Sequence, residues 1–292
     1  MSTLNKQIWT DQIQENFYPA VTFLTYARNF DSFVDNDIIN MAEAGFSPDV
    51  LVNNTTYPIA IKEREDIPLS FELDLFETEN TLVRNPDAVE LAYDKLESVI
   101  YGHRMALQTK TAQKAAHAYA PKIDSENTPI VTTTGDDNGE GFKRVTVTDI
   151  LKLKRKFDIL NVPADKRYLV LDPHHTEDLL LIDLKSFKDI TDFVDGKPKR
   201  FAGFNILEFT QNPTYNATTM EKKPFGAVAT ADDTYCSFAF SSDEVMRADG
   251  TIGMYDRIRD PELRATVVGF DKRFIALPIR NKGIGALVTA KV

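Results

Sequence analysis

The pattern of apolar and polar positions first sets apart residues 1–46. Apolar side chains are scattered through this stretch, Pro19 interrupts any long helix, and Gly45 with Pro48 marks a turn. We expect an arm of short helical pieces and extended chain that carries more apolar surface than it can bury alone. The alternative is an ordinary N-terminal segment packed on its own domain.

Residues 50–83 predict a long β-hairpin with a charged tip. The runs VLVNNTTYPIAI and IPLSFELDLFETENTLV have strand composition, and IKEREDIP joins them. Apolar and polar residues alternate in the second run, which predicts one apolar face and one polar face. The apolar face would consist of Leu69, Phe71, Leu73 and Leu75. Such a face on a projecting hairpin needs a cover, from the same chain or from a neighbour.

Residues 85–120 predict a single long helix. Asn85 can cap its start, Pro86 suits the first helical position, and Pro121 ends it. Apolar residues recur at three- and four-residue steps, and Gly102 weakens the helix locally. About 35 residues at 1.5 Å each give a helix of roughly 50 Å. Helices of compact domains average about 11–12 residues, so this one is expected to serve as a backbone for other elements.

The remainder predicts a loop and then a mixed region. Residues 122–143 read as a loop, whose GDDNGEG stretch lacks the ligand spacing of a calcium loop. Thr146 and Asp149 predict a capping box for a helix that ends at Asn161-Val-Pro163. RYLVLDP predicts a buried strand before a helix start at Asp172-Pro173. Further short strands are expected in FAGFNILEF, FGAVATA, SFAFS, ATVVGFD, RFIALPI and GIGALVTAK, so the fold class is α+β.

Composition narrows the class of protein. The chain has 292 residues, an ordinary globular composition and a formal net charge of −10, which argues against adhesion to nucleic acid through a basic face. Its one cysteine, Cys236, excludes an intramolecular disulfide and a Cys-based zinc site. There is no run of 18 apolar residues, so we expect no membrane span.

Two adjacent histidines, His174 and His175, are the strongest candidates for chemistry. They lie among Asp172, Glu177 and Asp178, which suggests a metal or acid–base site. Neighbouring residues of a helix point about 100° apart and rarely share one ion, whereas metal-binding helices use positions i and i+4. We therefore favour an exposed polar first turn of a helix. The nucleophile and phosphate-loop motifs that we sought are absent, and we expect no catalytic residue, cofactor or metal.

The segment NVPADKRYLVLDPHHTEDLL resembles a recurrent segment of tailed-bacteriophage major capsid proteins, which share the Hong Kong ninety-seven fold. TLVRNPDAVELAYDKLESVIYGHRMAL resembles the start of their spine helix. MYDRIRDPELRATVVGFDKRFIALPIRNKGIGALVTA resembles their returning strands. The order of elements resembles that family along most of the chain.

The resemblance implies a domain plan. It comprises an N-terminal arm (1–46), an E-loop (47–84), a P-domain with the spine helix (85–166), an A-domain (167–255) and a return to A/P-domain strands (256–292). The residues expected to contact neighbouring subunits are Trp9, Phe17, Phe71, Leu73 and Leu75.

The resemblance also implies a function and partners. It implies a major capsid protein that self-assembles, as pentamers and hexamers, into an icosahedral shell around double-stranded DNA. The expected partners are further copies of the chain, a separate scaffolding protein, a portal protein and the packaged DNA, with no membrane. The expected location is the virion, assembled in the host bacterial cytoplasm.

Two rival interpretations stay open from the sequence. One is an encapsulin-like shell of cellular origin with the same fold. The other is a soluble metal-dependent enzyme that uses His174, His175 and nearby carboxylates.

Overall fold

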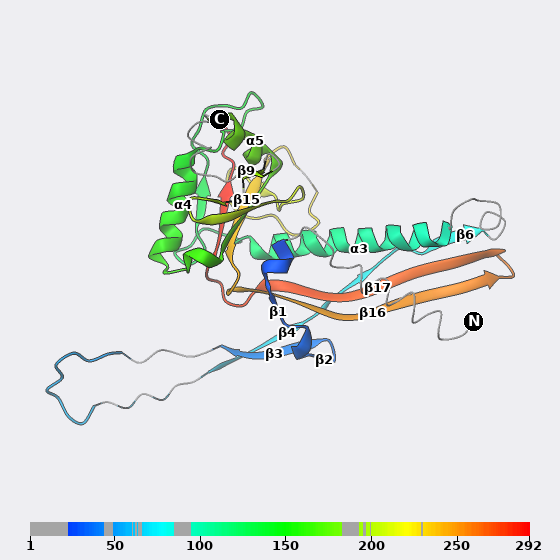
Figure 1. Ribbon diagram of the computed structural model, residues 1–292, viewed down its shortest axis with the longest axis horizontal. Coiled ribbons are helices and arrows are strands. Elements are labelled where there is room, and N and C mark those ends of the chain that lie inside the picture. The colour runs from blue at the N-terminus through cyan, green and yellow to red at the C-terminus, as the bar shows by residue number, and fades with distance from the viewer. Residues whose placement is uncertain are drawn as a thin grey trace.

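A long helix and a two-stranded ribbon run side by side away from a sheet-and-helix unit, and a thin loop projects the other way (Figure 1). This computed structural model describes residues 23–43, 49–59, 61, 63, 66–84, 95–182, 193–194, 197–198, 200–228 and 230–292. The described helices are α3 (Lys95–Tyr119), α4 (Val147–Ile159) and α5 (Pro173–Leu181), with short 3-10 turns η1 (Phe23–Tyr26), η2 (Asp31–Phe33) and η3 (Ala164–Lys166). No helix in these ranges is long and apolar enough to cross a membrane.

A six-stranded mixed sheet forms the centre of the sheet-and-helix unit. Its order is β11 (Arg200–Phe201), β12 (Phe204–Glu208), β8 (Arg167–Leu171), β15 (Cys236–Ser241), β18 (Ile284–Val288) and β7 (Ile130–Thr132). The predicted strands RYLVL and SFAFS are confirmed as β8 and β15. FAGFNILEF divides into β11 and β12, and β18 is the core of GIGALVTAK. The prediction of a loop over 122–143 is wrong at β7, which pairs parallel with β18.

Helix α4 covers this sheet, and local sequence sets both its start and its packing. Thr146 is the N-cap and forms the predicted capping box with Asp149. The fully buried side chain of Phe157 packs against Phe204 at a ring-centroid distance of 5.5 Å. A Cβ on Gly285 would lie 2.7 Å from the Phe157 ring, so only glycine lets strand and helix approach this closely. Helix α5 begins as predicted, with Asp172 as its N-cap and Pro in the first turn.

The ribbon consists of β16 (Val245–Asp260) and β17 (Ala265–Pro278), which pair antiparallel. With β1 (Arg28–Asn29), β5 (Asp74–Glu77) and β6 (Thr81–Arg84) it forms a five-stranded sheet. Sixteen residues at 3.3 Å each make a strand of about 50 Å. The predicted strands ATVVGFD and RFIALPI are wrong as separate elements because they form the single strand β17. Strand β16 was anticipated only in part.

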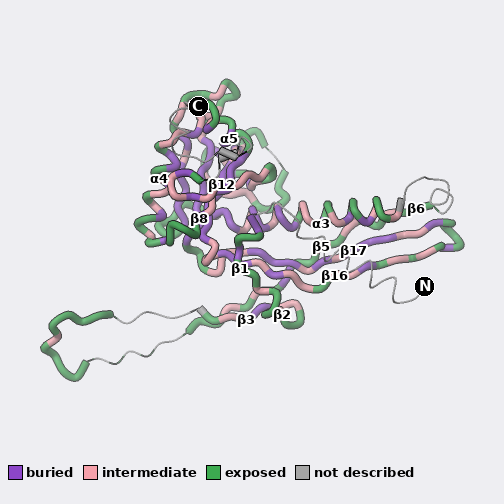
Figure 2. The backbone as a smooth tube through the Cα atoms, in the orientation of Figure 1, coloured by how far each residue is buried: buried purple, intermediate pink, exposed green. Residues whose placement is uncertain are grey.

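Helix α3 lies along the ribbon and packs its inner face on β17 (Figure 2). One apolar cluster joins them, with Ile100, Leu107, Met254, Val268 and Phe270 buried in it. The helix ends at Tyr119, close to the predicted stop at Pro121, and the Tyr119 hydroxyl donates to the Met246 carbonyl at 2.9 Å. The predicted start at residues 85–94 lies outside the described residues.

The chain before the projecting loop is fixed to the base of the ribbon. Strand β1 runs parallel to β16, and Asp31 accepts a hydrogen bond from the Asp249 backbone N–H at 2.7 Å. Asp249 in turn forms an ion pair with Lys272, which is 1% exposed. Burial raises the pKa of Asp249 and lowers that of Lys272, while their mutual attraction opposes both shifts.

A three-stranded sheet carries the segment that we call the projecting loop, which comprises residues 44–66. It comprises β2 (Val34–Asp35), β3 (Ile38–Glu43) and β4 (Ile67–Glu72). The predicted pairing is wrong: β4 pairs with β3, so its partner strand comes from residues assigned to the arm. Among the described residues, 49–59 hold no strand. FGAVATA likewise forms no strand in the part that is described.

Small two-stranded pieces complete the described structure. They are β9 (Phe193–Val194) with β10 (Lys197–Pro198), and β13 (Tyr215–Asn216) with β14 (Asp233–Thr234). The predicted domain boundaries stay predictions. Helix α4, which they place in the P-domain, contacts β7 and β18 of the six-stranded sheet.

Candidate inter-subunit surfaces

The five predicted contact residues have different surroundings. Trp9 and Phe17 lie outside the described residues. Phe71 is half-buried at the edge of a cluster around Ile39, and Leu75 is 45% exposed. Leu73 is 5% exposed and belongs to that same cluster.

The predicted alternation holds from Leu69 through Leu73 and is wrong at Leu75, which is exposed. Leu73 lies between β4 and β5, where its backbone N–H donates to the Asp37 carbonyl at 2.9 Å. Its side chain faces the core of its own chain, in the same cluster as Phe71. We therefore no longer propose Leu73 as an inter-subunit contact.

The projecting loop exposes apolar side chains in the run that the sequence led us to assign to the first strand of the hairpin. Val50 is 87% exposed, Val52 80% and Ile61 98%. Leu51, Tyr57 and Ile59 are exposed as well. The signal was present in VLVNNTTYPIAI, but assigning that run to a paired strand hid it. A set of large exposed apolar residues on one projecting segment is typical of an interaction surface.

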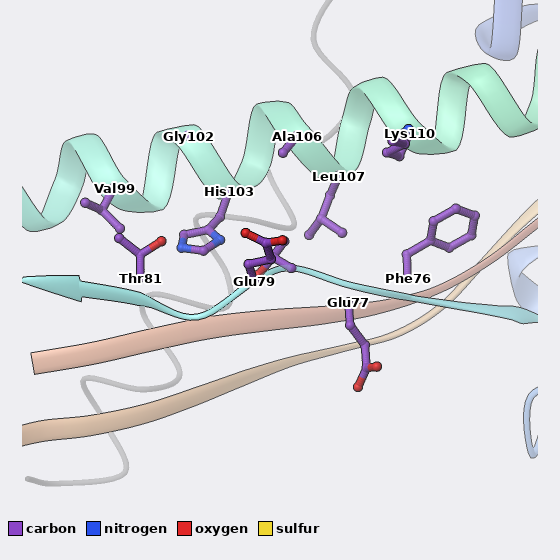
Figure 3. A pocket seen from close by; sticks show the side chains of 11 residues that line it. Phe76, Glu77, Glu79, Thr81, Val99, Gly102, His103, Ala106, Leu107 and Lys110 are labelled. Carbon is purple, nitrogen blue, oxygen red and sulfur yellow. The ribbon is translucent and has the colours of Figure 1, made fainter. Parts of the chain in front are cut away.

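A groove of about 510 Å³ lies between α3 and the segment that contains β5 and the start of β6 (Figure 3). Its α3 wall is formed by Val99, Gly102, His103, Ala106, Leu107 and Lys110, and its other wall by Phe76, Glu77, Thr78, Glu79 and Thr81. Figure 3 shows His103 and Leu107 pointing from the helix toward the strand segment. The sequence did not indicate this surface, because its two walls come from separate segments of the chain.

His103 is buried in the groove wall, with 7% of its surface exposed. Its ring lies 5.3 Å from the Phe270 ring, and burial lowers its pKa. Nε2 has no hydrogen-bond partner within the part of the chain that the structure describes. Buried polar atoms usually have one, so this atom indicates an incomplete surface.

The two adjacent histidines separate into an outer and an inner group. His174 stacks on Tyr235 at a centroid distance of 3.8 Å, and its Nδ1 lies 2.7 Å from Asp172 Oδ1. The expectation that both are exposed is wrong for His175, which is 1% exposed.

The ring nitrogens of His175 lie 2.6 Å from Ser237 Oγ and 2.7 Å from Thr289 Oγ1. Burial, with a smaller contribution from His174, lowers the pKa of His175 to about 3. Each ring nitrogen of His175 therefore has a hydroxyl partner. The His175–Ser237 pair is not accessible to a substrate, because both side chains are buried. Within the described residues no group of three or more His, Cys, Asp or Glu side chains could hold a metal ion.

The thiol of Cys236 is buried in β15. Asp178 of α5 accepts hydrogen bonds from Arg144 and from the Val145 backbone N–H, both at 3.0 Å. This polar region therefore connects the loop before α4 to α5.

The sequence matches no protein-family model and no curated protein. Solved structures do resemble the chain along nearly its whole length. One from Mycobacterium phage Che8 covers 92% of this chain and 91% of its own, with a TM-score of 0.67 and 15% identity. The capsid structure of cyanophage P-SCSP1u covers 92% and 88%, with a TM-score of 0.67 and 16% identity. A virus-like particle from Pyrococcus furiosus covers 97% and 99%, with a TM-score of 0.59 and 11% identity. The predicted α+β class is confirmed, and the chain has the Hong Kong ninety-seven fold of phage capsid structures.

Proposed function

We propose that this chain is the major capsid protein of a tailed bacteriophage and that it self-assembles into an icosahedral shell enclosing double-stranded DNA. The observation that carries the proposal is the match to phage capsid structures over about nine-tenths of both chains. The exposed apolar loop supports it independently, because a single subunit leaves that surface uncovered.

Assembly would proceed through contacts rather than through chemistry. The projecting loop would lie across an adjacent subunit, and the arm would bury Trp9 and Phe17 against a neighbouring α3. The six-stranded units would meet around five-fold and six-fold axes, in pentamers and hexamers. A net charge of −10 disfavours sticking to the packaged DNA and adds repulsion between copies. Assembly is therefore expected to become easier as salt screens that repulsion.

The proposed partners include a separate scaffolding protein and a portal protein, with assembly in the host cytoplasm. Unaided assembly of the pure protein into uniform shells of the correct size would contradict the need for scaffolding. By analogy with the fold, the precursor shell would expand on packaging, with α3 and the projecting loop changing orientation.

An encapsulin-like shell is the second candidate. The nearly complete mutual coverage with the Pyrococcus furiosus particle favours it. Particles purified from cells that also express the neighbouring genes separate the two functions. Nuclease-protected DNA of uniform length supports the phage capsid, whereas particles that hold a protein cargo and no such DNA support the second candidate. A subunit that stays a monomer or dimer under every condition contradicts both.

A further inference from the structure

The loop GDDNGEG, residues 135–141, gathers its polar groups around one peptide bond, which joins Asn138 to Gly139. The Asn138 backbone N–H donates to the Phe142 carbonyl at 2.8 Å and closes a tight turn. Gly139 has a φ of 91°, which glycine adopts without strain. This is the one place in the sequence where asparagine precedes glycine. Without a side chain on the second residue, its backbone nitrogen can approach the asparagine amide closely.

A carboxylate lies at the backbone nitrogen of Gly139. The Gly139 N–H donates to Asp137 Oδ1 at 2.9 Å. The Gly141 N–H donates to the same oxygen at 3.2 Å, which holds the carboxylate over the turn. A general base must lie within hydrogen-bond reach of the proton that it removes, and Asp137 meets that condition for the Gly139 nitrogen.

Two backbone donors lie at the side-chain carbonyl of Asn138. Its Oδ1 accepts hydrogen bonds from the Glu140 N–H at 2.8 Å and from the Phe142 N–H at 3.3 Å. A nucleophile that attacks Cγ moves negative charge onto this oxygen. Donors already in place stabilise such charge, as in the oxyanion hole of an acyl-transfer enzyme. The turn therefore combines a nucleophile, a base and an oxyanion site around one amide.

We propose that this loop modifies itself, with the Gly139 nitrogen attacking Asn138 Cγ and converting the asparagine into isoaspartate and aspartate. As the N–Cγ bond forms, Asp137 takes the proton from the Gly139 nitrogen, and the Glu140 and Phe142 N–H groups hold the oxyanion. The Cγ–Nδ2 bond then breaks, and Nδ2 leaves as ammonia with the proton that Asp137 took. Water opens the resulting succinimide at either carbonyl carbon. The reaction consumes one water, releases one ammonia and needs no oxidant or cofactor.

The conversion acts on the end of the chain, because the same loop holds it. The Val292 N–H donates to the Gly141 carbonyl at 3.1 Å, and Phe142 forms a β-bridge with Lys291. Both products add one negative charge, and isoaspartate also adds a methylene group to the main chain. The turn closed by Asn138 and Phe142 should therefore loosen its hold on residues 290–292. This chemistry belongs to the single subunit and does not depend on the proposed function.

Peptide mass spectrometry tests the reaction. The full chain is incubated at neutral pH, either folded or unfolded in guanidinium chloride, and trypsin releases peptide 123–143 at intervals. The same peptide contains Asn127, which precedes threonine and is the internal control. We expect Asn138 to convert about tenfold faster in the folded chain than in the unfolded chain, because only the folded turn positions the base and the donors. Equal or slower conversion in the folded chain would overturn the inference, whatever the outcome for shell formation.

Asp137→Asn tests the base. Its amide oxygen can still accept the Gly139 hydrogen bond but cannot take the proton, so conversion in the folded chain should fall by about tenfold. The matched control is Asp136→Asn, an exposed neighbour that is expected to convert at the wild-type rate. Thermal unfolding checks that both variants fold, and the comparison of folded with unfolded wild type decides if they do not. Conversion of folded Asp137→Asn at the wild-type rate would overturn the inference.

Hydrogen exchange tests the effect on the end of the chain. Converted and unconverted proteins, separated by anion exchange, are compared at the amides of residues 140–143 and 290–292. We expect faster exchange at both places in the converted protein. Equal exchange would overturn the inferred loosening of the chain end.

Discussion

The six-stranded unit and the α3 groove each bury a histidine, and the two histidines differ in how their polar atoms are satisfied. In the unit, His175 has Ser237 and Thr289 as partners, both from its own chain. In the groove, His103 leaves Nε2 without a partner among the described residues. Burial lowers the pKa of both rings. The ring nitrogens of His175 are therefore satisfied within one subunit, whereas His103 Nε2 is not satisfied by the described residues. We propose that a neighbouring subunit covers the exposed projecting loop.

The largest expected effect on subunit stability comes from opening a cavity in the unit. Phe157→Ala removes a fully buried ring between α4 and the sheet, which should lower the free energy of unfolding by about 3–5 kcal/mol. Urea denaturation of the dilute subunit measures this change. A loss below 1 kcal/mol would show that the unit is not the independent core that the comparison requires.

Acid should destabilise the unit through His175 by a similar amount. Its pKa is about 3 in the folded chain, against about 6.5 when unfolded. Between these values the unfolded chain binds a proton that the folded chain does not, so the stability present above pH 6.5 decreases as pH falls toward 3. The total is on the order of 5 kcal/mol, from a difference of about 3.5 pH units at about 1.4 kcal/mol per unit. His175→Gln should flatten this part of the profile, and parallel profiles for the two proteins would contradict the assignment.

A smaller effect is expected at the capping box of α4. Thr146→Ala removes an acceptor for the Asp149 backbone N–H and should cost about 1 kcal/mol. Thermal unfolding of the subunit provides the measurement. Thr146→Ser keeps the hydroxyl and is the matched control, and equal losses in both variants would rule out capping as the cause.

The smallest effect on stability is expected in the projecting loop. Val52→Asp with Ile61→Asp changes two exposed side chains and should alter the free energy of unfolding by no more than about 0.5 kcal/mol. Assembly should nevertheless be lost, because the two charges would have to be buried at the subunit interface. An unchanged urea midpoint together with the absence of shells would show that the projecting loop serves assembly and the six-stranded unit serves subunit stability. A shifted midpoint would contradict that separation.

Local signals could be predicted from sequence, whereas long-range pairings could not. The Thr146 capping box, the Asp172-Pro173 helix start and the helix stop at Pro121 depend on neighbouring residues and are confirmed. The predicted partner strand of β4 was wrong. Strand β3 takes that place, because its residue Ile39 is fully buried in a cluster with residues of the ribbon. Leu73 looked like part of an exposed stripe until its contact with the same cluster placed it in the core.

At the candidate inter-subunit surfaces, too, local features could be predicted from the sequence and long-range contacts could not. The sequence indicated that the chain leaves apolar surface for neighbours, but it did not indicate which residues of the loop are exposed. The hydroxyl partners of His175 lie 62 and 114 residues away in the chain, so no local pattern could have shown that it is buried. Gly102 was recognised only as a weak point in a helix, because the open space beside it depends on the packing of the β5–β6 segment.

Electron microscopy of the wild type beside the Val52→Asp, Ile61→Asp variant tests the central claim most directly. Both proteins are purified in the same way, from cells that co-express the neighbouring genes. We predict closed shells tens of nanometres across, roughly the scale of particles with many copies, for the wild type and only folded subunits for the variant. Shells of normal size and yield from the variant would contradict the claim that the exposed loop is completed by a neighbouring subunit.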